Sequence, residues 1–413
     1  MRAGGSAAAA VAVTGVGLVT AAGHSAKETW DEVTSARVPR GLSRPEELRD
    51  LPCDFMYTVD GLDIEAALGR STLLLDRFAQ LAVVAAREAV ADARLDPGSW
   101  DGTRVAVVVG TAHGGLRYYD EQQAVLTGRG ARRVAPKVAP LSVNNNAASG
   151  VCRDLGARGP SLAVSTACAS GTDAIGTALW LLRAGRCDIA VAGGAESLVS
   201  RLVFASTSQM RALSTRVDDP AAACRPFDAG RDGFVVGEGA GLLVLERAEH
   251  ARARGATVRA QVAGYGSSND AHSPVAPDET GAGIELALRS ALADAGVAAA
   301  DVGHVNAHGT STVLNDLVES AALHRVFGES PLVTSTKAMT GHALGAAGGI
   351  EAALTALALE SQLVPPTVNL QQQDPRVPVQ VVAGAARPAR LESAATTSLG
   401  FGGHNAVLVL TRA

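Results

Sequence analysis

The 413-residue sequence has few aromatic residues, few cysteines and no long uninterrupted apolar run. Aromatic side chains make up 3% of the chain, whereas small residues abound, which predicts a core built from elements that approach closely. Glycine, threonine and charged residues interrupt every apolar stretch, so we expect no membrane-spanning helix. The net charge of −5 provides no basic stripe, and no nucleic-acid partner is expected.

The cysteines are odd in number, widely spaced and without a CxxC pair. This pattern argues against both a disulfide framework and a zinc site made of thiolates, and it is typical of a reducing cytoplasm. Where nothing else marks a cysteine, as at positions 152 and 187, we interpret it as a small buried apolar residue. The five are Cys53, Cys152, Cys168, Cys187 and Cys224.

A low-charge stretch at residues 7–19 resembles the apolar part of a secretory signal. Thr14, Gly15 and Gly17 interrupt it, however, and a first buried strand with a tight turn explains it better. The same two glycines suggest a dinucleotide-binding loop, but Thr20 stands where the third glycine belongs and no acidic residue is well placed after a second strand. No phosphate-binding GK[ST] motif occurs in the sequence. We therefore expect a cytoplasmic protein without a nucleotide cofactor.

Short β-rich runs alternate with Ala/Leu-rich helical stretches along the chain. Alternation of this kind predicts layers of helices packed around buried sheets, an α/β fold. The predicted strand segments are 104–111, 186–194, 239–248, 257–266, 302–310 and 405–413.

Two pairs of segments resemble each other in the same order, which predicts an internal duplication. We place the halves at residues 1–250 and 251–413, with an insertion within residues 35–160 of the longer first half. In the first pair, Cys168 falls opposite Ala338. The pairs are VSTACASGTDAIGTALWLL (164–182) with TSTKAMTGHALGAAGGIEAAL (334–354), and EGAGLLVLERA (238–248) with GGHNAVLVLTRA (402–413).

Cys168 lies where a short β-branched run meets a helical pattern that extends to about Arg183. Backbone N–H groups at a helix start are unsatisfied and the helix dipole is positive there, so a thiolate is favoured over a thiol. A strained strand-to-helix turn presents the nucleophile in several enzyme classes, and Gly171 would let a substrate approach. From chemistry alone, Cys168 is either a nucleophile or a buried structural thiol.

A second strand-to-helix junction carries a histidine. The segment NAHGTSTVLNDLVE (306–319) places His308 after a strand and among small residues. A helix is predicted to follow, with Asp316 and Glu319 near its start.

A third junction, the duplicated counterpart of the cysteine segment, carries Lys337 and His342. The carboxyl ends of such strands meet on one side of a sheet, where sites form, so we expect His308 and His342 to lie near Cys168. The two histidines lack a clustered third ligand, and no metal site is expected.

Together these motifs resemble the β-ketoacyl-acyl-carrier-protein synthases, which are condensing enzymes of the thiolase superfamily. The resemblance runs almost from end to end, from AVTGVGLVTAAG (12–23) to SLGFGGHNAVLVL (398–410). It implies a thiolase-like α/β fold with duplicated halves in a layered α-β-α-β-α arrangement. The other matching motifs are RPFDAGRDGFVVGEGAG (225–241), NAHGTST (306–312), KAMTGHALGAAGG (337–349) and GFGGHN (400–405).

The set Cys168, His308 and His342 distinguishes this sequence from relatives of the same fold. Thiolases combine a cysteine with a histidine and a second cysteine, and starter-unit condensing enzymes use Cys, His and Asn. Chain-length-factor subunits, the inactive partners in type II polyketide systems, replace the nucleophile. The sequence departs from the family pattern at two places. Val313 stands where many members have proline, and LSVNNNAASG (141–150) is unusually polar. These differences bear on the shape of the pocket and on the choice of partner, not on the chemistry.

The resemblance implies a decarboxylative condensation without a cofactor. Cys168 would take an acyl group from a carrier-protein thioester, and malonyl-carrier protein would then lose CO2 to give an enolate that attacks the acyl-enzyme. His308 and His342 would hold the malonyl carbonyl and stabilise the enolate oxygen. The family pattern pairs Lys337 with Glu319, which would fix the geometry around both histidines.

The resemblance also assigns binding positions. Phe401 matches the gate over the acyl pocket, and the backbone N–H groups of Cys168 and Phe401 would form a second oxyanion site. Thr310 and Thr312 match positions that contact the phosphopantetheine arm.

The product would be a fatty acid or a type II polyketide. The alternatives are a ketosynthase subunit paired with a chain-length factor, making a polyketide or polyene, and a non-catalytic partner subunit.

The expected partners are acyl- and malonyl-loaded acyl carrier proteins and a second subunit. Carrier proteins are usually acidic, so the basic segment GRGARRVAPK (128–137) is either a docking patch or a solvated loop. The resemblance implies a two-fold dimer, either a homodimer or a heterodimer with a chain-length-factor-like homologue. The polar run VNNN (143–146) lies where a non-identical partner could contact the chain.

Overall fold

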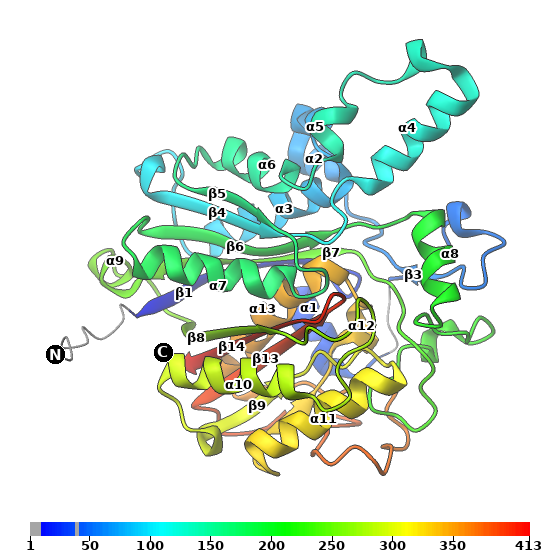
Figure 1. The fold of residues 1–413 in the computed structure, drawn as a ribbon. Coiled ribbons are helices and arrows are strands. Elements are labelled where there is room, and N and C mark those ends of the chain that lie inside the picture. The colour runs from blue at the N-terminus through cyan, green and yellow to red at the C-terminus, as the bar shows by residue number, and fades with distance from the viewer. Residues whose placement is uncertain (1–9, 38–40) are drawn as a thin grey trace.

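The computed structural model describes residues 10–37 and 41–413, and its main strands form one ten-stranded mixed sheet (Figure 1). The strand order is β10-β9-β13-β14-β8-β1-β7-β6-β4-β5. The first-half strands are β1 (Val11–Thr20), β4 (Val105–Gly110), β5 (Ser161–Val164), β6 (Ile189–Glu196) and β7 (Gly239–Arg247). The second-half strands are β8 (Ala260–Asn269), β9 (Val302–Asn306), β10 (Leu332–Thr334), β13 (Ser393–Gly400) and β14 (His404–Arg412).

The sheet consists of two five-stranded parts with the same topology. In each part the first strand lies at the seam, and the last strand of that half pairs with it antiparallel. The other three strands of each part are parallel to one another. Among the described strands, the two parts of the sheet pair with each other only where Val11–Val13 of β1 meets Ala260–Val262 of β8.

Helices cover both parts of the sheet and fill the space between them (Figure 1). The outer helices are α3 (Arg77–Asp92) and α6 (Asn146–Leu155) on the first part, and α10 (Ala282–Ala295) and α11 (Val313–Phe327) on the second. Between the parts lie α7 (Ser170–Arg183) and α13 (Ala347–Ser361). The predicted layered α-β-α-β-α fold is therefore confirmed. The remaining α-helices are α1 (Ala26–Ser35), α2 (Ile64–Leu68), α4 (Leu116–Arg129), α5 (Val138–Ser142), α8 (Arg201–Gln209), α9 (Ala248–Ala253) and α12 (Lys337–Thr340).

Paired glycines bring the outer helices onto the sheet in both halves. A Cβ at Gly17 of β1 would lie 1.9 Å from the carbonyl oxygen of Ala85 in α3. A Cβ at Gly266 of β8 would lie 2.2 Å from the carbonyl oxygen of Ala287 in α10. The N-terminal GxG motif is therefore a helix-packing feature in this fold, and its second-half counterpart has the same role.

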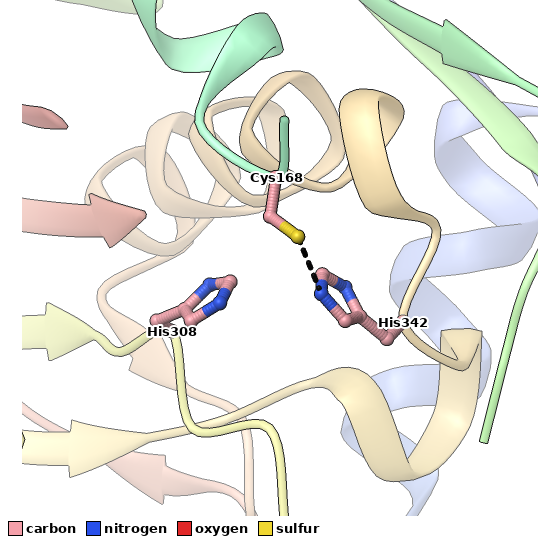
Figure 2. Close-up of side chains that lie close together, drawn as sticks. All are labelled: Cys168, His308 and His342. Atoms are coloured by element: carbon pink, nitrogen blue, oxygen red, sulfur yellow. Dashed lines mark hydrogen bonds between the residues drawn. The ribbon is translucent and has the colours of Figure 1, made fainter. Parts of the chain in front are cut away.

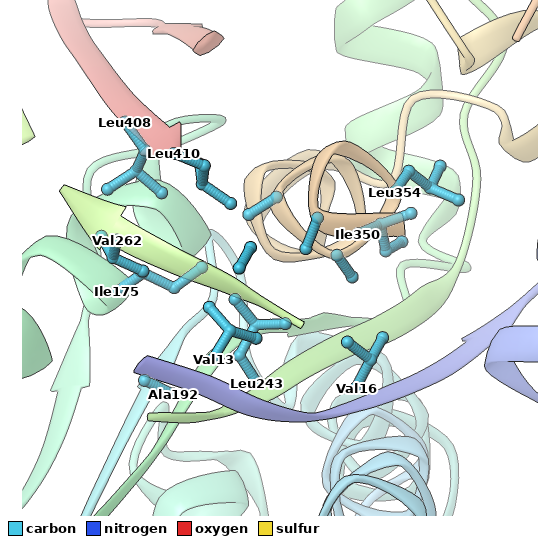
Figure 3. Close-up of a cluster of buried hydrophobic side chains, with 14 of the residues drawn as sticks. Val13, Val16, Ile175, Ala192, Leu243, Val262, Ile350, Leu354, Leu408 and Leu410 are labelled. Atoms are coloured by element: carbon cyan, nitrogen blue, oxygen red, sulfur yellow. The ribbon is translucent and has the colours of Figure 1, made fainter. Parts of the chain in front are cut away.

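Small aliphatic side chains fill the central layer, as the low aromatic content predicts (Figure 3). Ile175 of α7 and Ile350 and Leu354 of α13 pack between the inner faces of the two sheet parts. Gly171 of α7 allows this approach, because a Cβ there would lie 2.6 Å from the backbone nitrogen of Gly349. The prediction that Gly171 makes room for a substrate is therefore wrong.

The first half carries short elements that have no counterpart in the second. They include the two-stranded ribbon of β2 (Leu42–Ser43) and β3 (Met56–Tyr57), together with α2, α4 and α5. Helices α4 and α5 project from the top of the molecule in Figure 1. The second half has its own small ribbon, β11 (Leu363–Val364) with β12 (Arg387–Pro388).

Each predicted strand segment contains a strand, although β8 begins three residues into the segment 257–266. The run at 7–19 contains most of β1, which continues to Thr20, and its first three residues lie outside the described part of the chain. The buried strand is confirmed, but the tight turn predicted within it is wrong, because Gly15 and Gly17 lie in the strand. Strand β13 was not predicted, because its residues, SAATTSLG, are small and mostly polar. In the described ranges, none of the helices combines the length and the apolar character needed to cross a membrane.

Candidate active site

Cys168 lies in a tight turn between the end of β5 and the start of α7. Ala167 has a φ angle of 52°, a left-handed conformation that is strained for a residue with a side chain. The Ser170 hydroxyl holds the turn, donating to the carbonyl oxygen of Ala167 at 2.6 Å and accepting from the Thr166 N–H at 2.9 Å. The predicted strained strand-to-helix turn is confirmed, and Cys168 precedes the helix by two residues.

The structure brings Cys168, His308 and His342 together from three separate junctions (Figure 2). The Cys168 sulfur lies 3.2 Å from Nε2 of His342. The two imidazole rings have centroids 5.1 Å apart and stand nearly perpendicular, at 83°. All three side chains are buried, so a group bound at the sulfur also faces both histidines.

This triplet also has the spacing of a metal-binding site. One ligand atom from each of the three residues lies within 4.8 Å of the others. The sequence-based statement that the histidines lack a clustered third ligand is therefore wrong. The electrostatics nevertheless disfavour a cation, because the Lys337 ammonium lies 3.4 Å from Nδ1 of His308 and repels a second positive charge.

The resting cysteine is a thiol. Burial raises the pKa of Cys168 to about 12, while the charge of Lys337 and the backbone N–H of Phe401 act to lower it. Burial also lowers the pKa of His342 well below its ordinary value, so that histidine is neutral. The prediction of a resting thiolate is contradicted, because desolvation outweighs the helix terminus. The neutral His342 ring can instead exchange a proton with the sulfur.

Lys337 is fully buried and its ammonium pairs with the carboxylate of Glu351 on α13. Its Nζ also lies 3.4 Å from Nδ1 of His308. An ammonium has only donors, so Nδ1 of His308 is the acceptor and its Nε2 carries the hydrogen. Lys337 thereby fixes the tautomer in which His308 donates toward Cys168.

Glu319 does not take the position that the family pattern suggested. Among the described residues, the carboxylate bound to Lys337 belongs to Glu351. Glu319 accepts the backbone N–H of His308 at 2.7 Å and of Gly309 at 2.8 Å, as well as the hydroxyl of Thr397 at 2.6 Å. The Lys337–Glu319 pair is therefore corrected: Glu319 holds the backbone of the His308 loop, and Glu351 neutralises the lysine.

One sequence signal could have identified Glu351. It is the single carboxylate in the first three turns of α13, AGGIEAALTAL, which is otherwise composed of small and apolar residues plus one threonine. A carboxylate on such a buried helix requires a cationic partner. Burial raises the pKa of Glu351 to about 7, and Lys337 opposes that rise.

The predicted binding residues all line one cavity of about 450 Å³ that contains the catalytic triplet. Phe401 is 40% exposed and is followed by two glycines with positive φ angles, 83° and 76°. Thr310 and Thr312 share a hydrogen bond of 3.0 Å between their hydroxyls. Val313 occupies the first position of α11, where proline is also tolerated.

Sequence reasoning missed a second buried carboxylate next to this cavity. Glu196, at the end of β6, accepts the backbone N–H groups of Ala112 at 2.6 Å and Gly345 at 3.2 Å. It thereby ties the loop after β4 to the loop that follows His342. Burial raises the pKa of Glu196 to about 7. It follows AVAGGA, a run of small residues that gave no sign of its partners.

The chain matches two family models that follow one another along the sequence. These are "Beta-ketoacyl synthase, N-terminal domain" over residues 8–251 and "Beta-ketoacyl synthase, C-terminal domain" over residues 259–371. It is 41% identical to 3-oxoacyl-[acyl-carrier-protein] synthase 2 of Staphylococcus aureus (strain COL), over 97% of this chain and 98% of that protein.

Solved structures give the same result. The ishigamide ketosynthase/chain length factor matches with a TM-score of 0.90 and 34% identity, over 98% of this chain and 100% of that one. A type II polyketide acyl-carrier protein in complex with its ketosynthase bound to the hexaketide matches with a TM-score of 0.89 and 33% identity, over 98% and 99% of the two chains. The fold and the site thus define a condensing enzyme of the acyltransferase class. The chain belongs to the β-ketoacyl synthase family, as its sequence motifs predicted.

Proposed function

We propose that this protein elongates an acyl chain held on Cys168 by decarboxylative condensation with malonyl-acyl carrier protein. The observation that supports this most directly is the triplet itself, in which a thiol contacts the Nε2 atom of His342 at 3.2 Å beside His308. Such a site offers a nucleophile, a neutral base and a second donor within one buried cavity. The non-catalytic subunit remains the less favoured alternative, because this chain keeps the nucleophile.

In the first step the Cys168 sulfur attacks the acyl thioester. The thiol proton passes to Nε2 of His342 and then to the leaving pantetheine sulfur, so that one thioester replaces another. The backbone N–H of Phe401 already points at the sulfur, and with the N–H of Cys168 it can bind the oxygen of the tetrahedral intermediate. Thr310 and Thr312 are proposed to contact the pantetheine arm, and their position on the wall of the cavity supports this role.

In the second step the malonyl thioester loses CO2. The electron pair of the broken C–C bond becomes an enolate, whose oxygen accepts from Nε2–H of His308 and, once the ring hydrogen of His342 has exchanged from Nδ1 to Nε2, from Nε2–H of His342. The enolate carbon then attacks the acyl carbonyl on Cys168, and the cysteine leaves with the electron pair of its thioester bond. Lys337 supports this step by holding Nδ1 of His308 unprotonated.

Acyl carrier proteins deliver both substrates in this proposal, as the names of the relatives suggest. The basic segment 128–137 is exposed over its arginines and lies at the projecting end of α4, accessible to an acidic partner. The cytoplasm is the proposed compartment, in agreement with cysteines that are all free in the described chain.

A two-fold dimer is the proposed assembly, with either a second copy or a chain-length-factor-like homologue. The ishigamide ketosynthase/chain length factor supports the second form. Within the polar run 143–146, Asn146 is buried and its amide binds the Leu74 and Pro140 carbonyls, so it cannot contact a partner. The exposed Val143 and Asn145 and the half-buried Asn144 are the positions left for such contact.

The chain is further proposed to consist of two duplicated halves, 1–250 and 251–413. The repeated strand order of the two sheet parts supports this division. Helix α9 spans residue 250, so the junction falls at one of its ends.

Mass spectrometry of the intact protein tests the proposed function. Incubation with acyl-carrier proteins should add one acyl group at Cys168, and malonyl-carrier protein should then release an elongated product. His308→Ala and His342→Ala should each reduce malonyl decarboxylation by about 10²–10³-fold. Normal decarboxylation by both variants would contradict the enolate-stabilising role. Expression of the chain alone, followed by measurement of mass and activity, distinguishes a homodimer from a chain that requires a homologue.

A further inference from the structure

His113 is a third histidine on the wall of the cavity that contains Cys168, and the condensation steps described above do not use it. It follows β4 directly, two residues beyond Thr111. Its neighbours in the cavity wall include Ala112, Leu198 and Phe204. Leu198 and Phe204 belong to the same apolar cluster as Cys168, and Ala112 packs against it, so the part of the cavity wall next to His113 is largely hydrophobic.

The backbone of His113 is held in place by the buried carboxylate of Glu196. That carboxylate accepts the His113 N–H at 3.3 Å, together with the N–H of Ala112 and the hydroxyl of Thr111. The loop also packs directly on the His342 loop, because a Cβ at Gly345 would lie 2.3 Å from the Ala112 nitrogen. The imidazole is therefore presented from a fixed backbone and not from a free loop.

The imidazole of His113 has a buried nitrogen without a partner. Within the described chain, Nδ1 is inaccessible to solvent and forms no hydrogen bond. Burial lowers the pKa of His113, so the ring is neutral and carries one donor and one acceptor nitrogen. Because Nδ1 is closed off, the other ring nitrogen, Nε2, is the one that a chain in the cavity can reach. A bound group that supplies a hydrogen bond to this nitrogen stabilises the complex.

We propose that His113 makes this enzyme select acyl chains that carry an oxygen function along their length over fully saturated chains. A keto oxygen can accept from the imidazole N–H, and a hydroxyl can donate to its bare nitrogen, whereas methylene groups can do neither. A site built to hydrogen-bond a substrate oxygen discriminates against the analogue that lacks it. The inference rests on the proposed function, because it concerns the acyl group held on Cys168.

The substrate class that follows is a partly or wholly unreduced chain. Condensation leaves a keto group at the third carbon of each product, and a chain returned to Cys168 without full reduction keeps oxygen at alternate carbons. The surrounding apolar wall accommodates the carbons between them. No covalent step beyond the acyl transfer to Cys168 is required.

Competitive loading of Cys168, followed by intact-protein mass spectrometry, tests this selection. The substrates are an octanoyl-carrier protein and eight-carbon analogues with a keto or hydroxyl group at carbon 3, 5 or 7. We expect the wild-type protein to load at least one oxygenated chain roughly tenfold faster than octanoyl. His113→Leu should remove that ratio. His113→Gln, whose side-chain amide reaches near the position of Nε2, should restore part of it.

His324→Leu is the matched control, because Nδ1 of His324 is also buried without a partner but lies on α11, outside the cavity wall. It should leave the loading ratio unchanged. A thermal melt of each variant checks that it is folded. Equal loading of octanoyl and oxygenated chains by the wild-type protein, or an unchanged ratio in folded His113→Leu, would overturn the selection. Failure of the wild-type protein to load any chain would overturn the proposed function and the role of His113 with it.

Discussion

The two halves of the molecule carry equivalent strand-to-helix junctions that differ in charge. The junction after β5 presents Cys168 as a neutral thiol whose pKa is raised by burial. The junction after β10 presents Lys337, an ammonium buried against the carboxylate of Glu351. Because α7 and α13 pack on each other, the two junctions face the same space. The comparison shows how a duplicated scaffold separates a nucleophile from the charge that organises its surroundings.

Two carboxylates hold the loops that lie beside these junctions by accepting backbone N–H groups. Glu196 binds the loops near Cys168, and Glu319 binds the loop of His308. Both are fully buried. Loops on both sides of the site are thus held by a buried carboxylate. The buried Lys337 is the feature that distinguishes the second junction from the first.

The largest effect is expected from removing the nucleophile of the first junction. Cys168→Ala should lower the condensation rate by at least about a thousandfold, because the described cavity wall offers no other thiol near the histidines. Product formation from acyl- and malonyl-carrier proteins measures this. Cys168→Gln, whose amide resembles an acylated cysteine, should lose condensation but keep malonyl decarboxylation. Elongation by Cys168→Ala would disprove the nucleophile assignment.

Breaking the charge pair of the second junction should affect stability as well as activity. Lys337→Met or Glu351→Leu leaves one buried charge unpaired, which costs about 3–5 kcal/mol in the free energy of unfolding. The double variant should cost much less than the sum of the two, as chemical denaturation would show. Additive losses would mean that the two side chains do not interact.

The charge state of Cys168 is tested by its rate of alkylation by iodoacetamide. A pKa of about 12 means that the thiolate fraction, and hence the rate, rises about tenfold per pH unit through pH 9. Lys337 lowers this pKa, so a folded Lys337→Met variant should react more slowly at each pH. Peptide mapping separates Cys168 from the partly buried Cys152. A plateau in the Cys168 rate below pH 8 would indicate a resting thiolate instead.

The smallest effect is expected outside both junctions, at the projecting basic segment. Arg132→Ala combined with Arg133→Ala should raise the KM for carrier-protein substrates a few-fold, with little change in kcat. The effect should shrink at high salt, because both side chains are exposed. Arg158→Ala, which removes an exposed arginine elsewhere on the first half, serves as the control. An equal change in both proteins would mean that the segment is only a solvated loop.

The strands and the three junctions could be predicted from sequence because periodicity and glycine-rich turns are local signals. Cys168, His308 and His342 were placed by these signals and by family motifs, and the structure brings them together. What the sequence could not supply is the set of long-range partners. The choice between Glu319 and Glu351 depends on how α13 lies against the His308 loop, which no local pattern encodes.

The effect of desolvation on the pKa of Cys168 was also underestimated from the sequence. The helix start near Cys168 suggested a thiolate, but the pKa depends on how completely the cavity wall excludes water. His113 and Glu196 escaped notice for the same reason. A histidine in a glycine-rich loop and a glutamate after a strand are common in sequences. They are recognised as functional candidates only when the structure shows that they are buried.

The pairing of β1 with β7, and of β8 with β14, has a consequence for biosynthesis. In each half the first strand made is the antiparallel neighbour of the last, from Val11 with Arg247 to Ala260 with Arg412. Neither half can close its sheet until its final strand has left the ribosome, and such distant pairings form slowly. The nascent chain therefore emerges with exposed strand edges over most of its synthesis. Strand β14 lies inside the sheet, between β13 and β8. The second half therefore cannot complete its fold without the residues of β14.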